Sequence, residues 1–119
     1  MADEIAVIAG LSFEKGGKSA SIAAIRQTID MTGGDYVHRN QTIGTSEEAL
    51  DIGDIGTPGW CGFTNLDGTN FISLRAGSGL ANMIKVLPGE TVVFRLATST
   101  PYAIADTGAC DSEYLILET

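Results

Sequence analysis

Most of this chain alternates apolar and polar residues with a period of two, which is the repeat of an extended strand. The odd positions are apolar from Ile5 to Phe13 and mostly apolar again from Ile25 to Met31. No stretch long enough for a helix has a convincing helical period, and turn sequences recur about every ten residues. We therefore predict an all-β chain that forms an antiparallel β-sandwich, jelly-roll-like, with at most one short helix.

Glycine pairs and one change of parity define the first two strands. The turn Lys15–Lys18 contains Gly16-Gly17 and closes the first strand against the second. Ile22 falls on the opposite parity from Ile25, which indicates a β-bulge or a helical turn near Ala23-Ala24.

Two further dipeptides predict hairpins in the second half of the chain. Asp67-Gly68 is typical of a two-residue type I′ turn. Pro88-Gly89 fits the two central positions of a type II turn.

A length of 119 residues suits one domain, and an apolar content of 44% is enough to form a core. We predict a single β-sandwich domain over residues 1–119. The expected core consists of apolar residues inside the alternating strands: Val7, Leu11, Ile25, Ile29, Trp60, Leu66, Ile72, Ile84, Val86, Val92, Phe94, Ile104, Leu115 and Leu117.

The net charge of −8, with only seven scattered Lys and Arg residues, argues against direct binding of nucleic acid, which requires a clustered cationic face. The acidity indicates a solvated surface, with a basic partner as the alternative reading. No segment is apolar for long enough to span a bilayer. Asp3 and Glu4 stand where a signal peptide would be basic, so we expect folding in a cytoplasm and no membrane association.

Residues capable of catalysis or metal binding are few. His38 is the single histidine, and Cys61 and Cys110 have no metal-binding spacing. Asp51 and Asp54, like the acids of residues 106–113, match no calcium loop and are interpreted as turn formers. We expect no enzymatic activity, no cofactor, no metal and no disulfide.

Three aromatic residues are candidates for a ligand platform. Trp60, Tyr36 and Tyr102 would stack on a sugar if they shared one face. The alternative is that Trp60 anchors the core.

Four segments of the second half carry a resemblance to a known group of proteins: Phe63–Ile72, Ile84–Glu90, Ala103–Thr107 and Glu113–Glu118. In this order they resemble small β proteins encoded among the virion genes of tailed bacteriophages. The resemblance implies a structural protein of the virion, in capsid decoration, neck or tail, assembled in the host bacterial cytoplasm. Its partners would be other virion proteins and further copies of itself, forming a homo-oligomer. A carbohydrate- or receptor-binding module is the alternative function.

Residues 45–57 form a connection longer than a hairpin needs, with one possible helical turn at Ser46–Leu50. We predict that it contacts another subunit, or else is a mobile loop. In the first case Ile52 and Ile55 are exposed and bury against the neighbour, and acids at the rim provide specificity. The segment Met1–Glu4 is a second predicted contact. The predicted rim consists of Glu47, Glu48, Asp51 and Asp54.

Overall fold

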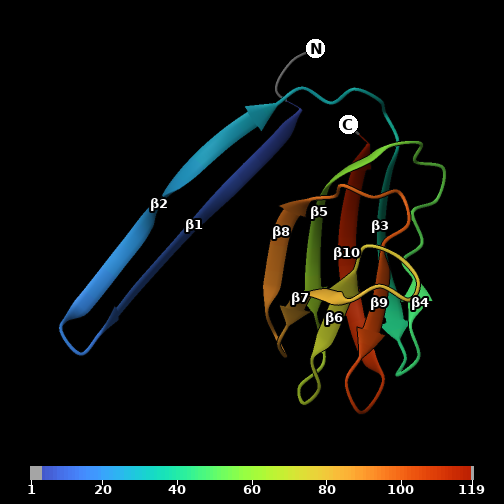
Figure 1. The fold of residues 1–119 in the computed structure, drawn as a ribbon. Helices are drawn as coiled ribbons and strands as arrows, with labels where there is room; N and C mark the ends of the chain where they lie inside the picture. The colour runs from blue at the N-terminus through green and yellow to red at the C-terminus, as the bar shows by residue number, and fades with distance from the viewer. Residues whose placement is uncertain (1–3, 119) are drawn as a thin grey trace. The chain divides into compact units, whose positions relative to one another are not determined.

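The computed structural model describes residues 4–118 and contains strands but no helix within that range. The chain separates into two compact units, Met1–Thr32 and Gly33–Thr119 (Figure 1). Residues 1–3, which belong to the predicted contact Met1–Glu4, lie outside the described residues.

The first unit is a long antiparallel hairpin of β1 (Ile5–Lys15) and β2 (Lys18–Ile29). Gly16 and Gly17 connect the strands with φ of 58° and 79°. A type I′ turn requires positive φ at both central residues, and only glycine adopts this without steric cost. The predicted turn at Lys15–Lys18 is confirmed.

The predicted irregularity near Ala23-Ala24 is a β-bulge. Ala9 pairs with Ile25 and Leu11 pairs with Ile22, so Gly10 alone lies opposite two residues of β2. A Cβ atom at Gly10 would lie 2.8 Å from the Ala24 Cα, which explains why glycine occupies this position.

The second unit contains eight strands: β3 (Tyr36–Ile43), β4 (Glu48–Ala49), β5 (Pro58–Asn65), β6 (Ile72–Arg75), β7 (Asn82–Val86), β8 (Thr91–Arg95), β9 (Tyr102–Ala105) and β10 (Cys110–Glu118). They form two four-stranded sheets of order β3-β10-β5-β8 and β4-β9-β6-β7. The pairs are nested, β3 with β10, β4 with β9, β5 with β8 and β6 with β7, and successive pairs alternate between the sheets (Figure 1). This is the jelly-roll arrangement, so the predicted fold class is confirmed.

β1 and β2 take no part in either sheet of the jelly roll. The prediction of one sandwich over residues 1–119 placed both strands inside it. The sandwich instead occupies β3 to β10, and the hairpin forms a unit of its own.

The two hairpins predicted in the second half are wrong in their pairing. β5 and β6, which flank Asp67-Gly68, belong to different sheets, as do β7 and β8, which flank Pro88-Gly89. The local turn at Pro88-Gly89 does form: Glu90 N donates to Leu87 O at 3.0 Å, and Gly89 has φ of 78°. Turn chemistry is local, whereas the choice of partner strand depends on the whole sandwich.

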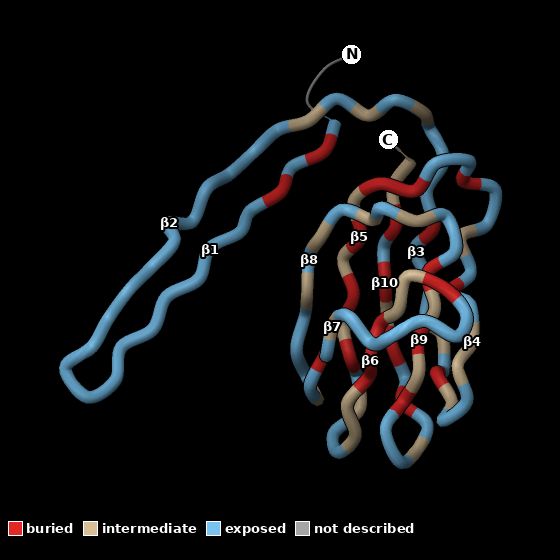
Figure 2. The backbone as a smooth tube through the Cα atoms, viewed as in Figure 1, coloured by how far each residue is buried: buried red, intermediate tan, exposed pale blue. Residues whose placement is uncertain are grey.

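The core lies between the two sheets (Figure 2). Ile72 and Val86 are buried in this core as predicted, and Val7 of β1 is buried but does not belong to the core cluster. Ile84, Val92 and Phe94 are partly buried against the core cluster. The prediction was wrong for four positions that are exposed: Leu11, Ile25, Leu66 and Leu115.

The inward face of β10 is the reverse of the predicted one. Tyr114 and Ile116 are buried, whereas Leu115 is exposed and Leu117 is half-buried. Both parities of this strand carry large apolar residues, so alternation alone does not select the face. Tyr114 is accommodated inside because its ring stacks on Phe63, with centroids 6.0 Å apart, and its hydroxyl has polar partners.

Candidate functional site

The predicted contact residues of segment 45–57 lie inside the fold. Ile55 is 5% exposed and belongs to the core cluster, and Ile52 packs partly buried against that cluster. Ile55 N donates to Ile52 O at 3.2 Å, which closes a turn between these two residues. The prediction that they are exposed is wrong. The predicted helical turn at Ser46–Leu50 contains β4 instead, which pairs with β9.

Glu47, predicted at the rim of an interface, instead holds the loop between β6 and β7. Its carboxylate accepts hydrogen bonds from the Ser78 hydroxyl and from Gly79 N at 3.0 Å, and it pairs with Arg75 Nη1 at 2.6 Å. The Ser78 hydrogen bond, followed by that of Gly79, lowers the pKa of Glu47 below its usual range. This carboxylate therefore stabilises the loop of the β6–β7 hairpin and does not form the rim of an interface.

Two further predicted rim acids also bind groups of their own unit. Glu48 accepts from Gln41 Nε2 at 3.0 Å, and Asp51 pairs with Arg39 Nη1 at 2.7 Å. Asp54 is exposed. Three of the four predicted rim acids thus bind groups of the jelly roll rather than forming a rim around an exposed apolar centre.

The predicted aromatic platform is divided between the two sheets. Tyr36 and Trp60 lie on the outer face of the β3-β10-β5-β8 sheet, with Leu117 of β10 between them. Tyr102 belongs to the other sheet and pairs with Ala49 and Arg75. The Arg95 guanidinium lies 5.2 Å from the centre of the Trp60 ring.

Reactive side chains are either buried or paired with a neighbour. Burial raises the pKa of Cys61 to about 12, and burial also raises the pKa of Cys110, so both free thiols stay protonated at neutral pH. His38 Nε2 lies 2.7 Å from the Glu113 carboxylate on an exposed face. Within the described part of the chain, no three His, Cys, Asp or Glu side chains are placed to bind a metal ion.

The hairpin presents one continuous apolar face. The bulge places Ile22 and Ile25 on the same side, where they join Leu11 and Phe13. These four side chains are strongly exposed: Leu11 74%, Phe13 56%, Ile22 69% and Ile25 58%. We call Leu11, Phe13, Ile22 and Ile25 the hairpin face.

The opposite side of the hairpin is mostly polar. It carries Ser12, Glu14 and Ser21 near the tip and Arg26 nearer the base, with Ile8 as its one large apolar residue. A ribbon that is apolar on one side only is built to lie against another surface. Large exposed apolar patches mark interaction sites, and an isolated two-stranded hairpin is marginally stable in water.

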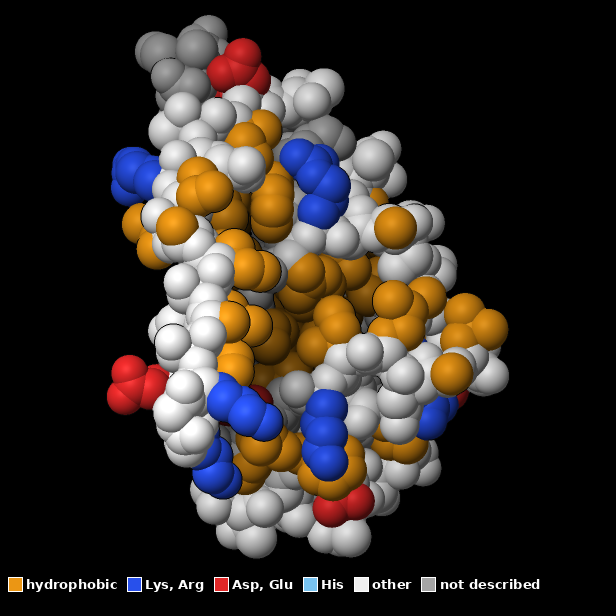
Figure 3. Space-filling view, turned by 60° about the vertical axis from the view of Figure 1, so that its left-hand side comes forward, with side chains coloured by type: hydrophobic (Ala, Val, Ile, Leu, Met, Phe, Trp, Pro, Cys, Tyr) orange, Lys and Arg blue, Asp and Glu red, His pale blue; other side chains and the backbone are white. Residues whose placement is uncertain are grey.

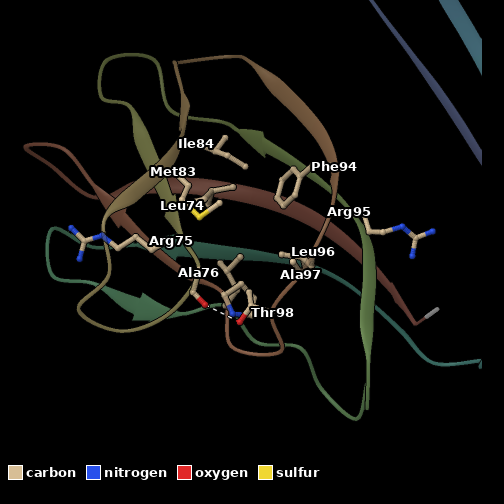
Figure 4. A pocket seen from close by; sticks show the side chains of 12 residues that line it. Leu74, Arg75, Ala76, Met83, Ile84, Phe94, Arg95, Leu96, Ala97 and Thr98 are labelled. Atoms are coloured by element: carbon tan, nitrogen blue, oxygen red, sulfur yellow. Dashed lines mark hydrogen bonds between the residues drawn. The ribbon is translucent and has the colours of Figure 1, made fainter.

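A second apolar surface is a groove of about 230 Å³ between the edge strands β7 and β8. In Figure 3, hydrophobic side chains are exposed on the side of the molecule that includes the edge strands β7 and β8. Ile84, Phe94 and Leu96 extend into the space, whereas Arg75 and Arg95 point away from it on opposite sides (Figure 4). The apolar lining is formed chiefly by Leu50, Leu74, Met83, Ile84, Phe94 and Leu96.

No protein-family model, curated protein or solved structure matches this chain. The apolar surfaces of the chain itself therefore carry the functional inference. Across residues 4–118 no helix is long and apolar enough to cross a bilayer.

Sequence reasoning assigned both surfaces to the interior. Leu11 and Ile25 of the hairpin, and Ile84 and Phe94 of the groove, were expected to be core residues because they alternate regularly with polar neighbours. Alternation shows that one face of a strand is covered but does not say by what. The available signal was the unbroken alternation from Ile5 to Phe13, which is longer than the common strand length of about five or six residues.

Proposed function

We propose that this chain is a structural protein of a tailed-bacteriophage particle, a capsid-decoration, neck or tail component, and that it assembles through its hairpin face. The observation that carries the proposal is the exposure of Leu11, Phe13, Ile22 and Ile25 on one side of the β1–β2 hairpin. Burying a surface of this kind against another protein lowers the free energy of the system.

The free energy expected from burying the hairpin face suits a weak contact that is repeated many times in an assembly. Complete burial of a large apolar side chain contributes about 1.5–3 kcal/mol, so four side chains that are more than half exposed contribute on the order of 5 kcal/mol. That is less than the ~8 kcal/mol of a micromolar complex. Many copies held by symmetry convert such weak contacts into a stable assembly.

The fold and the sequence segments also support a particle protein. Jelly rolls recur in viral capsid and lectin domains, although a fold by itself assigns no function. The segments that resemble virion proteins of tailed bacteriophages lie within the jelly roll, from β5 to β10.

The alternative, a carbohydrate- or receptor-binding module, has less support. Tyr102 does not share a face with Trp60 and Tyr36, and the Trp60 ring is already packed against the Arg95 guanidinium. A sugar platform requires aromatic faces that are free and close together.

Mass spectrometry of gradient-purified virions of the phage that encodes the chain tests the proposal. We expect the parent chain in the particles and a strong loss of incorporation for the double variant Leu11→Ser/Ile22→Ser. Ile8→Ser is the matched control, because Ile8 is 61% exposed on the opposite side of the same hairpin and should be incorporated normally. Absence of the parent chain from purified virions contradicts the proposal.

A further inference from the structure

Resting on the assembly proposed above, we propose that the groove between β7 and β8 receives the hairpin face of a second copy of this chain, with Phe13 seated in it. The chain then carries both halves of its own interface, the hairpin on one unit and the groove on the other. Each copy donates one contact and accepts one.

The groove is open because both sheets end there. β8 is the last strand of its sheet and β7 the last of the other, so no further strand covers the core beyond them. Phe94 and Ile84, which pack against the core cluster from one side, border the groove on the other (Figure 4). An apolar insert would complete the burial that the jelly roll leaves unfinished at this edge.

The volume fits an aromatic side chain. An apolar cavity of ~150 Å³ holds one benzene ring. The groove, at about 230 Å³, therefore has room for the Phe13 ring and part of a neighbouring aliphatic side chain. Phe13 lies two residues before the turn at Lys15–Lys18, near the tip of the hairpin, where an entering side chain is least hindered by its own strands.

The net charges of the two units favour the jelly roll, rather than a second hairpin, as the surface that the hairpin face binds. Residues 5–29 contain Lys15, Lys18, Arg26 and one acid, Glu14, for a net charge of +2. Residues 36–118 contain four cations and ten acids, for a net charge of −6. Packing two hairpin faces together would bring like charges together, whereas hairpin on jelly roll joins opposite charges. Both arginines beside the groove have partners within the jelly roll: Arg75 pairs with Glu47, and the Arg95 guanidinium lies over the Trp60 ring.

This contact is head-to-tail, because two different surfaces meet. Such an interface builds a ring if the rotation between copies closes and a filament if it does not. A symmetric contact between two hairpins would stop at a dimer. The two arrangements therefore differ in how single-surface variants behave when they are mixed.

Light scattering coupled to size exclusion, on the full chain, tests this with two variants. Phe13→Glu disables the hairpin, and Met83→Glu places a charge at the groove on a residue that is 69% exposed. Ile8→Glu and Val93→Glu are the controls: each adds the same charge at an exposed position, on the other side of the hairpin and on the outer side of β8. Circular dichroism verifies that all four remain folded.

We expect the parent and both controls to form oligomers and each surface variant to be a 12.4 kDa monomer. A mixture of Phe13→Glu and Met83→Glu should form a 1:1 dimer and nothing larger, because one functional hairpin meets one functional groove. Oligomers of Met83→Glu like those of the parent, a monomeric parent, or a mixture without dimer would each overturn the proposal. Loss of virion incorporation on changing the hairpin alone would leave the proposed function standing.

Discussion

Ile22 and Ile25 lie on the same face of the β1–β2 hairpin although they stand three positions apart in one strand. In a regular strand they would point to opposite sides. The bulge, in which Gly10 faces two residues of β2, restores the apolar face beyond Ala23-Ala24. Continuity of the hairpin face therefore depends on a backbone irregularity that only a small residue at position 10 allows.

Gly10→Ala should loosen the hairpin without affecting the jelly roll. The added Cβ would lie 2.8 Å from the Ala24 Cα, and relieving this overlap should cost about 1–3 kcal/mol. Amide hydrogen exchange is the measurement, with faster exchange expected in residues 5–29 and none of the change in β3 and β10. Deleting Ala24 in the same variant removes the extra residue and should restore protection. Unchanged exchange in the single variant would show that the bulge is not sterically determined.

Ile55→Ser should destabilise the jelly roll. Ile55 is 5% exposed in the core cluster, and removing most of a buried isoleucine costs about 2–5 kcal/mol. Urea unfolding followed by tryptophan fluorescence measures the change. Leu66→Ser is the control, because Leu66 is 48% exposed and should change stability by less than about 0.5 kcal/mol. Equal stability of the two variants would show that Ile55 does not contribute to the core.

Tyr114→Phe should destabilise the fold through a hydrogen-bond network. The Tyr114 hydroxyl accepts from Asp51 N at 2.9 Å and lies 2.8 Å from Gln41 Oε1, to which it donates. Burial raises the pKa of this tyrosine to about 12. Removing the hydroxyl leaves partners unsatisfied at a cost of about 1–3 kcal/mol, measured by urea unfolding. Tyr36→Phe is the control: Tyr36 is 64% exposed, so this change should leave the free energy of unfolding unaltered. Equal losses of stability in the two variants would show that the hydrogen bonds of the Tyr114 hydroxyl do not stabilise the fold.

The loop between β6 and β7 should loosen in acid. The Ser78 and Gly79 hydrogen bonds lower the pKa of Glu47 in the folded chain from the usual 4.5. A lowered folded-state pKa contributes stability that is complete above the unfolded value and is lost as the pH falls through the folded one. Thermal unfolding should therefore show parent and Glu47→Gln differing near neutral pH and converging well below pH 4.5. A difference that is constant with pH would exclude the carboxylate as its cause.

Local features of the fold were predictable because they depend on neighbours in sequence. The turn at Gly16-Gly17 follows from glycine's tolerance of positive φ, and the bulge follows from the parity of Ile22 and Ile25. Asp67-Gly68 shows the boundary of this reasoning. The Asp67 carboxylate does hold a tight loop, accepting from Asn70 N at 2.7 Å, yet the flanking strands enter different sheets.

The sequence by itself determined that this chain is all-β, where most strands begin and end, and that one face of each strand is apolar, since these follow from alternation and turn chemistry. Only the tertiary structure decided which surface covers each apolar face. It buried Tyr114 rather than Leu115 in a strand that is apolar on both sides, drew Ile55 into the core, and left Phe13 without cover. The physical reason is that burial depends on the partner sheet, and the choice of partner is made by contacts distant in sequence.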